Sequence, residues 1–213
     1  ILWQRGDVAE SASERARPPG SQASEGESAM TDRVVRADEV IEFWFQTLTP
    51  RQWFAKDDAL DGRIRDDFGA TLAAAAAGET WQWRTSARGR LAEILVLDQF
   101  SRNIYRGEPR AFACDGQALV LAQEAVSQRA DRVLDPPWRA FLYMPYMHSE
   151  SLRVHDEALR LFDQPGLEHN LHHEHRHREV LVRFGRYPQR NEALGRASTA
   201  EELAFLAQPG NRF

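Results

Sequence analysis

Apolar residues recur every three or four positions along most of the chain from Asp38 onward. This spacing is typical of amphipathic helices, which bury one face. The pattern is densest between Arg88 and Tyr105, where the apolar positions are Leu91, Ile94, Leu95, Val96, Leu97 and Phe100. Because a helix that is apolar on most faces is buried on most faces, we predict that residues 88–105 form a central helix against which the others pack.

The same periodicity predicts helices on both sides of this one. They cover residues 38–45, 57–77, 115–128, 138–147, 149–162, 168–184, 188–194 and 199–206, with Asp38 as the first cap and a short element after Thr49. No segment alternates apolar and polar residues with the period of a strand. Short connections favour antiparallel neighbours, so we predict an all-α domain of stacked helical hairpins.

The first part of the chain has a different composition. Residues 1–29 are rich in Ser, Glu, Gly, Pro and Arg and have no apolar periodicity. A segment of this kind cannot bury enough apolar surface to order. We expect residues 1–29 to be a disordered extension outside the fold, Met30 to be the natural start, and residues 30–213 to form a single all-α domain.

Charge and cysteine usage narrow the classes of partner. The chain has 27 basic and 32 acidic residues and a net charge of −5, which argues against binding nucleic acid by phosphate neutralisation. Its single cysteine, Cys114, excludes internal disulfides and fits a reducing compartment. No apolar run approaches the ~20 residues that cross a bilayer. We expect a soluble, cytoplasmic protein with no nucleic-acid or membrane partner.

Polar side chains gather where the predicted helices begin or end. Asp98 and Arg102 lie four residues apart in the last turns of the central helix, so they share a face and can pair. Gly185 and Pro188 predict the end of one helix and the start of the next, a corner that directs nearby arginines toward a common point. The candidate site residues are Asp98, Arg102, Asn103, His148, Glu150, His177, Arg183, Arg186, Arg190 and Asn191.

Several arginines near helix N-termini suit a small carboxylate or phosphate ligand. The ligand-binding residues would be Arg102, Asn103, Arg183, Arg186, Arg190 and Asn191. For turnover, His148 or His177 would be the base, because imidazole titrates near neutral pH, and Asp98 or Glu150 would orient it. The same set could instead form a buried ion-pair network that joins helix ends.

The segment 173–177, HEHRH, matches the helical zinc motif H-E-x-x-H. Arg176 places a cation where such helices have an uncharged residue, and no histidine follows His177 as a third ligand. The match also lies within a histidine-rich run, where chance matches arise easily. We therefore predict no metal ligands and no cofactor, and the run itself leaves metal binding open.

Aromatic residues cluster in the first third of the chain and again at residues 138–146. Aromatic rows at helical spacing are most often core. The other interpretation is a groove for a peptide, a common use of stacked helical hairpins. An exposed patch around Trp53, Phe54 and Trp81 would favour that interpretation.

Several motifs together resemble a known family. They include Phe43-Trp44-Phe45, the segment Asp98–Asn103, His148-Ser149-Glu150 and the segment Arg183–Asn191. In this order they resemble the bacterial family of domain of unknown function 924. The resemblance covers about residues 38–213 and implies an all-α, tetratricopeptide-like, right-handed arrangement, but no activity.

Two positions depart from the family pattern. Ser101 stands where proline is common, and Gln189 stands where histidine is common. The second departure weakens any mechanism that needs an acid–base histidine at that position. We predict a polar pocket that binds a small anionic ligand or peptide, with hydrolytic turnover as its activity if it is an enzyme; the alternative is a non-enzymatic protein- or peptide-interaction module.

Overall fold

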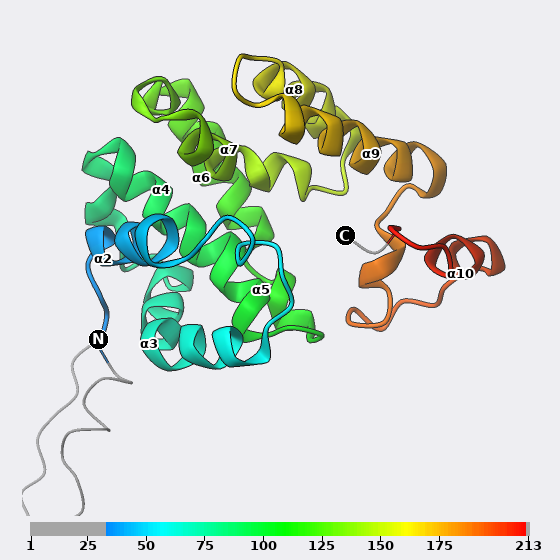
Figure 1. Cartoon of the computed structure of the whole chain (residues 1–213), viewed down its shortest axis with the longest axis horizontal. Helices are drawn as coiled ribbons and strands as arrows, with labels where there is room; N and C mark the ends of the chain where they lie inside the picture. Colours follow the sequence, from blue (N-terminus) through cyan, green and yellow to red (C-terminus); the bar gives the residue numbers. More distant parts are fainter. Residues whose placement is uncertain (1–32, 212–213) are drawn as a thin grey trace, which may run out of the picture.

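The computed structural model describes residues 33–211, and among them helices, turns and loops account for the whole chain, with no strand (Figure 1). The predicted all-α class is confirmed. The predicted extension, residues 1–29, lies outside the described residues.

The α-helices are α2 (Ala37–Glu42), α3 (Asp58–Ala76), α4 (Ala87–Leu95), α5 (Ser101–Ile104), α6 (Asp115–Ser127), α7 (Pro136–Met147), α8 (Leu152–Phe162), α9 (Glu168–Phe184) and α10 (Ala200–Leu206). Shorter π or 3₁₀ turns are η1 (Phe43–Thr47), η2 (Trp81–Thr85), η3 (Val96–Phe100), η4 (Pro109–Phe112), η5 (Ala130–Val133) and η6 (Pro188–Arg190).

Local signals in the sequence begin and end several of these helices. The Asp57 carboxylate caps α3 by accepting hydrogen bonds from the backbone N–H groups of Ala59 and Leu60, at 3.0 and 3.1 Å. Gly185 adopts φ 69° where α9 ends, a conformation that glycine tolerates without strain. The prediction of Asp38 as a cap is wrong, because that residue lies in the first turn of α2.

The predicted central helix is observed as α4, η3 and α5 in direct succession, and residues 91–100 are all buried. It contacts α2, α3, α6 and α7. The π turn coincides with two side chains that take up backbone carbonyls: the Ser101 hydroxyl donates to Leu97 O at 2.6 Å, and Arg102 donates to Asp98 O at 2.6 Å. Side chains that compete for these carbonyls loosen the helical ladder, and π turns of this kind recur at functional sites.

Two hydrophobic clusters hold the helices together. The larger one joins α2 to α8 and includes the first-third aromatics Phe43 and Trp44. The smaller one is C-terminal and contains Val180, Leu181 and Tyr187. Helices α7, α8 and α9 pack in sequence order, and α10 lies beyond them beside η6 (Figure 1). The tetratricopeptide-like arrangement stays a prediction. No helix within residues 33–211 is long and apolar enough to cross a membrane.

Two predicted elements are not regular α-helices. Residues 50–54 form turns that carry Trp53 and Phe54, and the predicted helix 188–194 is the short η6 followed by turns. The chain reverses at Gly195, where φ is 64°, and Arg196 takes the Tyr187 carbonyl that a longer helix would use. Side chains from both of these turns line one pocket, among them Phe54 and Arg190.

Candidate functional site

A pocket of about 550 Å³ opens between the turn at residues 53–56, the π turn η3 with α5, the end of α7, α9 and η6. It brings together five of the ten predicted site residues, namely Arg102, Asn103, His148, His177 and Arg190. Its other polar or aromatic lining residues are Trp53, Phe54, Lys56, Gln99, Arg106, Phe112, Tyr187 and Gln189. The two lining residues that lie farthest apart in the sequence, Trp53 and Arg190, are separated by 137 positions. The pocket is therefore built from distant parts of the chain.

The centre of the pocket wall is a histidine bonded to a buried carboxylate. Nδ1 of His148 lies 2.7 Å from Oδ1 of Asp98, whose side chain is 1% exposed. Gln99 also donates to the Asp98 carboxylate, and Arg102 lies 3.2 Å from it. The predicted pairing of Asp98 with Arg102 is confirmed. The carboxylate fixes the imidazole so that its other ring nitrogen, Nε2, is the one available for chemistry.

The electrostatics of this pair favour a charged carboxylate and a neutral imidazole. Burial opposes ionisation of Asp98, but the Arg102 guanidinium and the hydrogen bonds from His148 and Gln99 outweigh it and hold the pKa of Asp98 below its ordinary value. Burial lowers the pKa of His148. The negative charge of Asp98 opposes this shift, and the positive charge of Arg102 adds to it. A neutral His148 with its proton on Nδ1 presents an unprotonated Nε2, which can accept a proton.

Two arginines flank His148 and share one carboxylate. Arg102 donates to Asp115 Oδ2 at 2.9 Å, and Arg190 donates to the same oxygen at 3.1 Å. Arg190 also donates to the His148 carbonyl at 2.8 Å, and its guanidinium lies 4.8 Å from the centre of the Phe112 ring. Each guanidinium has five N–H donors in a fixed fork, so donors are left for a ligand after these bonds are made.

Asn103 is held at the pocket by a residue from α3. Its side-chain amide donates to Asp61 Oδ1 at 2.7 Å, and Arg106 donates to the two oxygens of the same carboxylate at 2.6 and 2.9 Å. Sequence reasoning missed Asp61, because nothing in the sequence marks a pairing across more than 40 positions. Arg106 directly follows the central helix, so extending the polar set by one turn would have included it.

His177 lines the same pocket but differs from His148. Its Nδ1 lies 2.8 Å from the His173 carbonyl, so this nitrogen is bonded to a backbone group rather than to a carboxylate. Burial lowers the pKa of His177 to about 3. Its ring packs edge-on against Tyr187, with centroids 5.7 Å apart. A histidine with so low a pKa is a weak proton acceptor, and His148 is the better base of the two.

Five predicted site residues do not line the pocket. One is Asp98, which is bonded to His148 behind the lining. The other four are Glu150, Arg183, Arg186 and Asn191, which pair with neighbours in the C-terminal segment. Glu150 accepts from Arg196 at 2.7 and 2.9 Å, Arg186 donates to Glu202 at 2.7 Å, Arg183 donates to Glu201 at 2.8 Å, and the Asn191 amide donates to Ser198 at 3.0 Å. For these four residues, the interpretation as a network that joins helix ends fits the contacts.

The HEHRH segment is arranged differently from a zinc motif. Glu174 is fully buried and bonded to His155 of α8, so it does not face the histidines of its own motif. The His173 ring instead meets His169, with Nε2 atoms 3.1 Å apart. Within residues 33–211 no group of three or more His, Cys, Asp or Glu side chains is placed to hold a metal ion.

The aromatic clusters divide between core and surface. Phe43, Trp44 and Phe141 are buried, whereas Phe54 is 67% exposed and Trp81 is 60% exposed. Phe54 lies at the pocket and stacks on Phe141, with ring centroids 6.1 Å apart. Trp81 lies on η2, which packs against α4 and does not line the pocket. The two exposed rings are therefore on separate elements.

Comparisons with known proteins give a family and a fold. The model of a family described as bacterial protein of unknown function (DUF924) matches residues 40–210. The solved structure of a protein of unknown function from Agrobacterium tumefaciens is 37% identical, with a TM-score of 0.76, over 80% of this chain and 96% of that one. No curated protein matches the chain. The chain thus belongs to the DUF924 family of bacterial proteins.

Proposed function

We propose that the pocket binds a small anionic ligand and that His148 acts on it as a general base. The observation that carries the proposal is the Asp98–His148 pair, with Nδ1 and Oδ1 2.7 Å apart, in the wall of a pocket that also contains Arg102 and Arg190. A carboxylate that fixes an imidazole beside anion-binding donors is an arrangement suited to proton abstraction.

Water is the nucleophile in this proposal. None of the described residues that line the pocket is Ser, Thr or Cys, and the hydroxyl of Tyr187 is engaged, since it donates to the Met147 carbonyl at 2.6 Å. The proposal therefore assigns no hydroxyl or thiol of the lining to a covalent intermediate. His148 Nε2 would take a proton from a water, and the water oxygen would bond to the carbonyl or phosphoryl centre of the ligand. The bond from that centre to the leaving oxygen would then break, and His148 would return its proton to the leaving oxygen. The anionic group of the ligand would lie against the remaining N–H donors of Arg102 and Arg190, which also stabilise negative charge that develops in the transition state. This is the hydrolytic form of the function.

The arginines are placed before a ligand arrives. Arg102 and Arg190 are fixed by Asp115, and Arg190 is packed between the rings of Phe112 and Tyr187, 4.8 and 4.7 Å from its guanidinium carbon. Donors that are already oriented lose little freedom on binding. The fixed positions of Arg102 and Arg190 therefore support a role in ligand binding more strongly than mobile surface arginines would.

A peptide is the second candidate ligand. Phe54 is 67% exposed at the pocket, and the only lysine of the chain, Lys56, lies two residues later in the lining. An aromatic ring beside cations would suit an acidic peptide whose side chain enters the pocket. In this non-enzymatic case the arginines bind and His148 does not transfer a proton.

The test combines a thermal-shift screen with a hydrolysis assay on the full chain. Anionic metabolites, acidic peptides, and chromogenic carboxylic and phosphoric esters are offered to the native protein and to His148→Asn and Arg190→Gln. Asn keeps an N–H donor toward Asp98 but has no basic nitrogen. We expect His148→Asn to bind the ligand and to lose roughly 100-fold or more in kcat, and Arg190→Gln to lose binding.

Arg153→Gln on α8 is the control, because it removes the same charge from an exposed residue outside the pocket. Binding of an acidic peptide with no turnover by the native protein would support the peptide candidate. A ligand whose affinity is unchanged in Arg190→Gln, with both variants folded by circular dichroism, would rule out this pocket as the site.

A further inference from the structure

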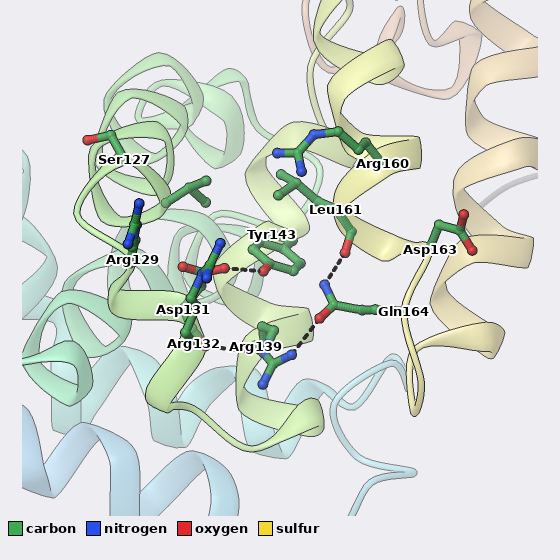
Figure 2. Close-up of a pocket in the computed structure, with 11 residues that line it drawn as sticks. Ser127, Arg129, Asp131, Arg132, Arg139, Tyr143, Arg160, Leu161, Asp163 and Gln164 are labelled. Carbon is green, nitrogen blue, oxygen red and sulfur yellow. Dashed lines mark hydrogen bonds between the residues drawn. The ribbon is translucent and has the colours of Figure 1, made fainter.

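A second hollow, of about 420 Å³, lies at the junction of α6, η5, α7 and α8 (Figure 2). It shares no lining residue with the His148 pocket, although α7 contributes to both. Arg139 and Tyr143 of α7 line the second hollow, whereas Met144 of the same helix and His148, which directly follows it, line the first. The two sites therefore lie on different faces of one helix.

Four arginines from separate elements converge on this hollow, namely Arg129, Arg132, Arg139 and Arg160. Figure 2 shows Arg129 and Arg160 on opposite sides of the opening, with Asp131 and Tyr143 between them. The lining also contains the carboxylates of Asp131 and Asp163, and Arg160 pairs with Glu157 outside the lining, so four positive side chains face three negative ones. The balance of charge favours an anion.

These arginines differ in how far they are already engaged. Arg139 is structural: it donates to the carbonyls of Asp131 and Leu134 at 3.1 and 2.8 Å and to Gln164. In contrast, the side chains of Arg129 and Arg132 make no hydrogen bond or ion pair with any other residue between 33 and 211, and only their backbone groups are bonded. Arg132 is exposed and η5 fixes its backbone, so its guanidinium can approach an anion without breaking an existing contact.

Asp131 is the buried polar group of the hollow. It is 9% exposed, and its Oδ2 accepts a hydrogen bond from the Tyr143 hydroxyl at 2.6 Å. Its Oδ1 is buried with no hydrogen-bond partner among the described residues. A buried carboxylate oxygen without a donor is costly, and such exceptions in a folded protein call for a partner. The missing partner is a donor, not an acceptor.

The backbone conformation of Arg129 also favours a binding site in this hollow. Its φ of 58° is the only positive φ of a residue other than glycine among the described residues. A left-handed conformation at a residue with a side chain is disfavoured, and residues held in it concentrate at binding sites. In Figure 2 the Arg129 side chain lies at the left edge of the same hollow, beside Asp131.

We propose that this hollow is a site for hydrogen phosphate, an oxyanion that brings its own O–H group. Arg129 and Arg132 would bind the unprotonated oxygens through their N–H forks, and the phosphate O–H would donate to Asp131 Oδ1. A small shift of the arginine side chains over Asp131 would admit that contact. Sulfate has the same shape and charge but no proton near neutral pH, so it would place a bare oxygen against the carboxylate.

The requirement for an O–H donor also distinguishes free phosphate from a phosphomonoester. A phosphomonoester has a second pKa of about 6, so near pH 8 it is a dianion without an O–H. Free phosphate still has one proton at that pH. The site should therefore rank free phosphate above both an ester and sulfate.

The test is isothermal titration calorimetry of the full chain near pH 8 with sodium phosphate, sodium sulfate and glycerol phosphate. We expect phosphate to bind at least tenfold more tightly than either competitor, because a group positioned to accept a hydrogen bond discriminates against a ligand that lacks the donor. Asp131→Asn replaces the acceptor with an amide that can also donate, so the phosphate-to-sulfate ratio should fall toward one. Arg132→Gln should weaken all three anions together, whereas Arg153→Gln, which lies on α8 outside the hollow, should weaken none.

Arg129→Gly guards against a loss of binding through unfolding. Glycine accepts a φ of 58°, so this variant removes the guanidinium at a position where the backbone change is tolerated, and we expect an unchanged Tm with weaker phosphate binding. Equal affinity of the native protein for phosphate and sulfate would overturn the proposal. So would equal affinity for glycerol phosphate, absence of phosphate binding at millimolar concentration, or undiminished binding by Arg129→Gly and Arg132→Gln.

Discussion

Arginine–carboxylate pairs occur both at the His148 pocket and in the C-terminal segment, but they lie in different surroundings. At the pocket, Arg102 pairs with Asp98, and the two side chains are 19% and 1% exposed. In the C-terminal segment, Arg183 pairs with Glu201, and the side chains are 50% and 63% exposed. Each pair joins an arginine to a carboxylate, at 3.2 Å in the first and 2.8 Å in the second. Burial is what separates them.

The difference decides what each pair contributes. An exposed pair is screened by water and typically contributes about 0–1 kcal/mol, whereas removing one partner of a buried pair leaves a charge without compensation at about 3–5 kcal/mol. The pocket pairs therefore hold charged groups in fixed positions, and the exposed pair at Arg183 contributes little. Five of the ten predicted site residues line one pocket, and four form a network in the C-terminal segment. Ligand binding at the pocket stays a prediction.

The largest effect is expected from Asp98→Asn. This change removes a buried charge that faces both Arg102 and His148, so we expect the free energy of unfolding to fall by about 3–5 kcal/mol. Urea denaturation followed by circular dichroism measures the change. Asp163→Asn, an exposed aspartate after α8, is the control and should stay within about 0.5 kcal/mol of the native protein. A loss below about 1 kcal/mol for Asp98→Asn would mean that the pocket pair is no stronger than a surface pair.

A decrease in pH is expected to have an intermediate effect on the free energy of unfolding. The folded pKa of His177 is about 3, below the unfolded value near 6.5, so between these values the unfolded chain binds a proton that the folded chain does not. The stability from His177 is present above pH ~6.5 and decreases as pH falls, by about 2 kcal/mol at pH ~5. Urea unfolding at several pH values should show this slope. His177→Gln should reduce it and His175→Gln, an exposed neighbour on α9, should not; identical slopes in both variants would place the titration elsewhere.

The smallest effect is expected at the C-terminal arginines. Arg183→Ala should change the free energy of unfolding by roughly 0–1 kcal/mol, because its pair with Glu201 is exposed. Arg186→Ala removes the contacts to Glu202 and to the Ala197 carbonyl, so α10 should become more sensitive to limited proteolysis. Neither change should alter ligand affinity at the His148 pocket. A tenfold loss of affinity in Arg186→Ala would place that residue back in the site.

Sequence patterns predicted the part of the structure that local spacing controls. The dense apolar run of residues 91–100 predicted a buried helix, and the glycine at 185 predicted the end of α9. Spacing of four residues likewise predicted the contact of Asp98 with Arg102. These predictions depend on neighbours in one helix, where geometry follows directly from sequence separation.

The tertiary structure decided which polar residues meet. Asp98 and His148 are 50 positions apart, and Asp115 and Arg190 are 75 apart, so no local period relates them. Glu174 and His177 belong to one sequence motif, yet packing buries the first against α8 and turns the second toward the pocket. The sequence by itself determined the helices and their apolar faces, because these follow from backbone hydrogen bonding and hydrophobic burial within a few turns. The site required the packed structure, since desolvation and long-range contacts, rather than residue type, distinguish His148, which is bonded to a carboxylate, from His177, which is bonded to a backbone carbonyl.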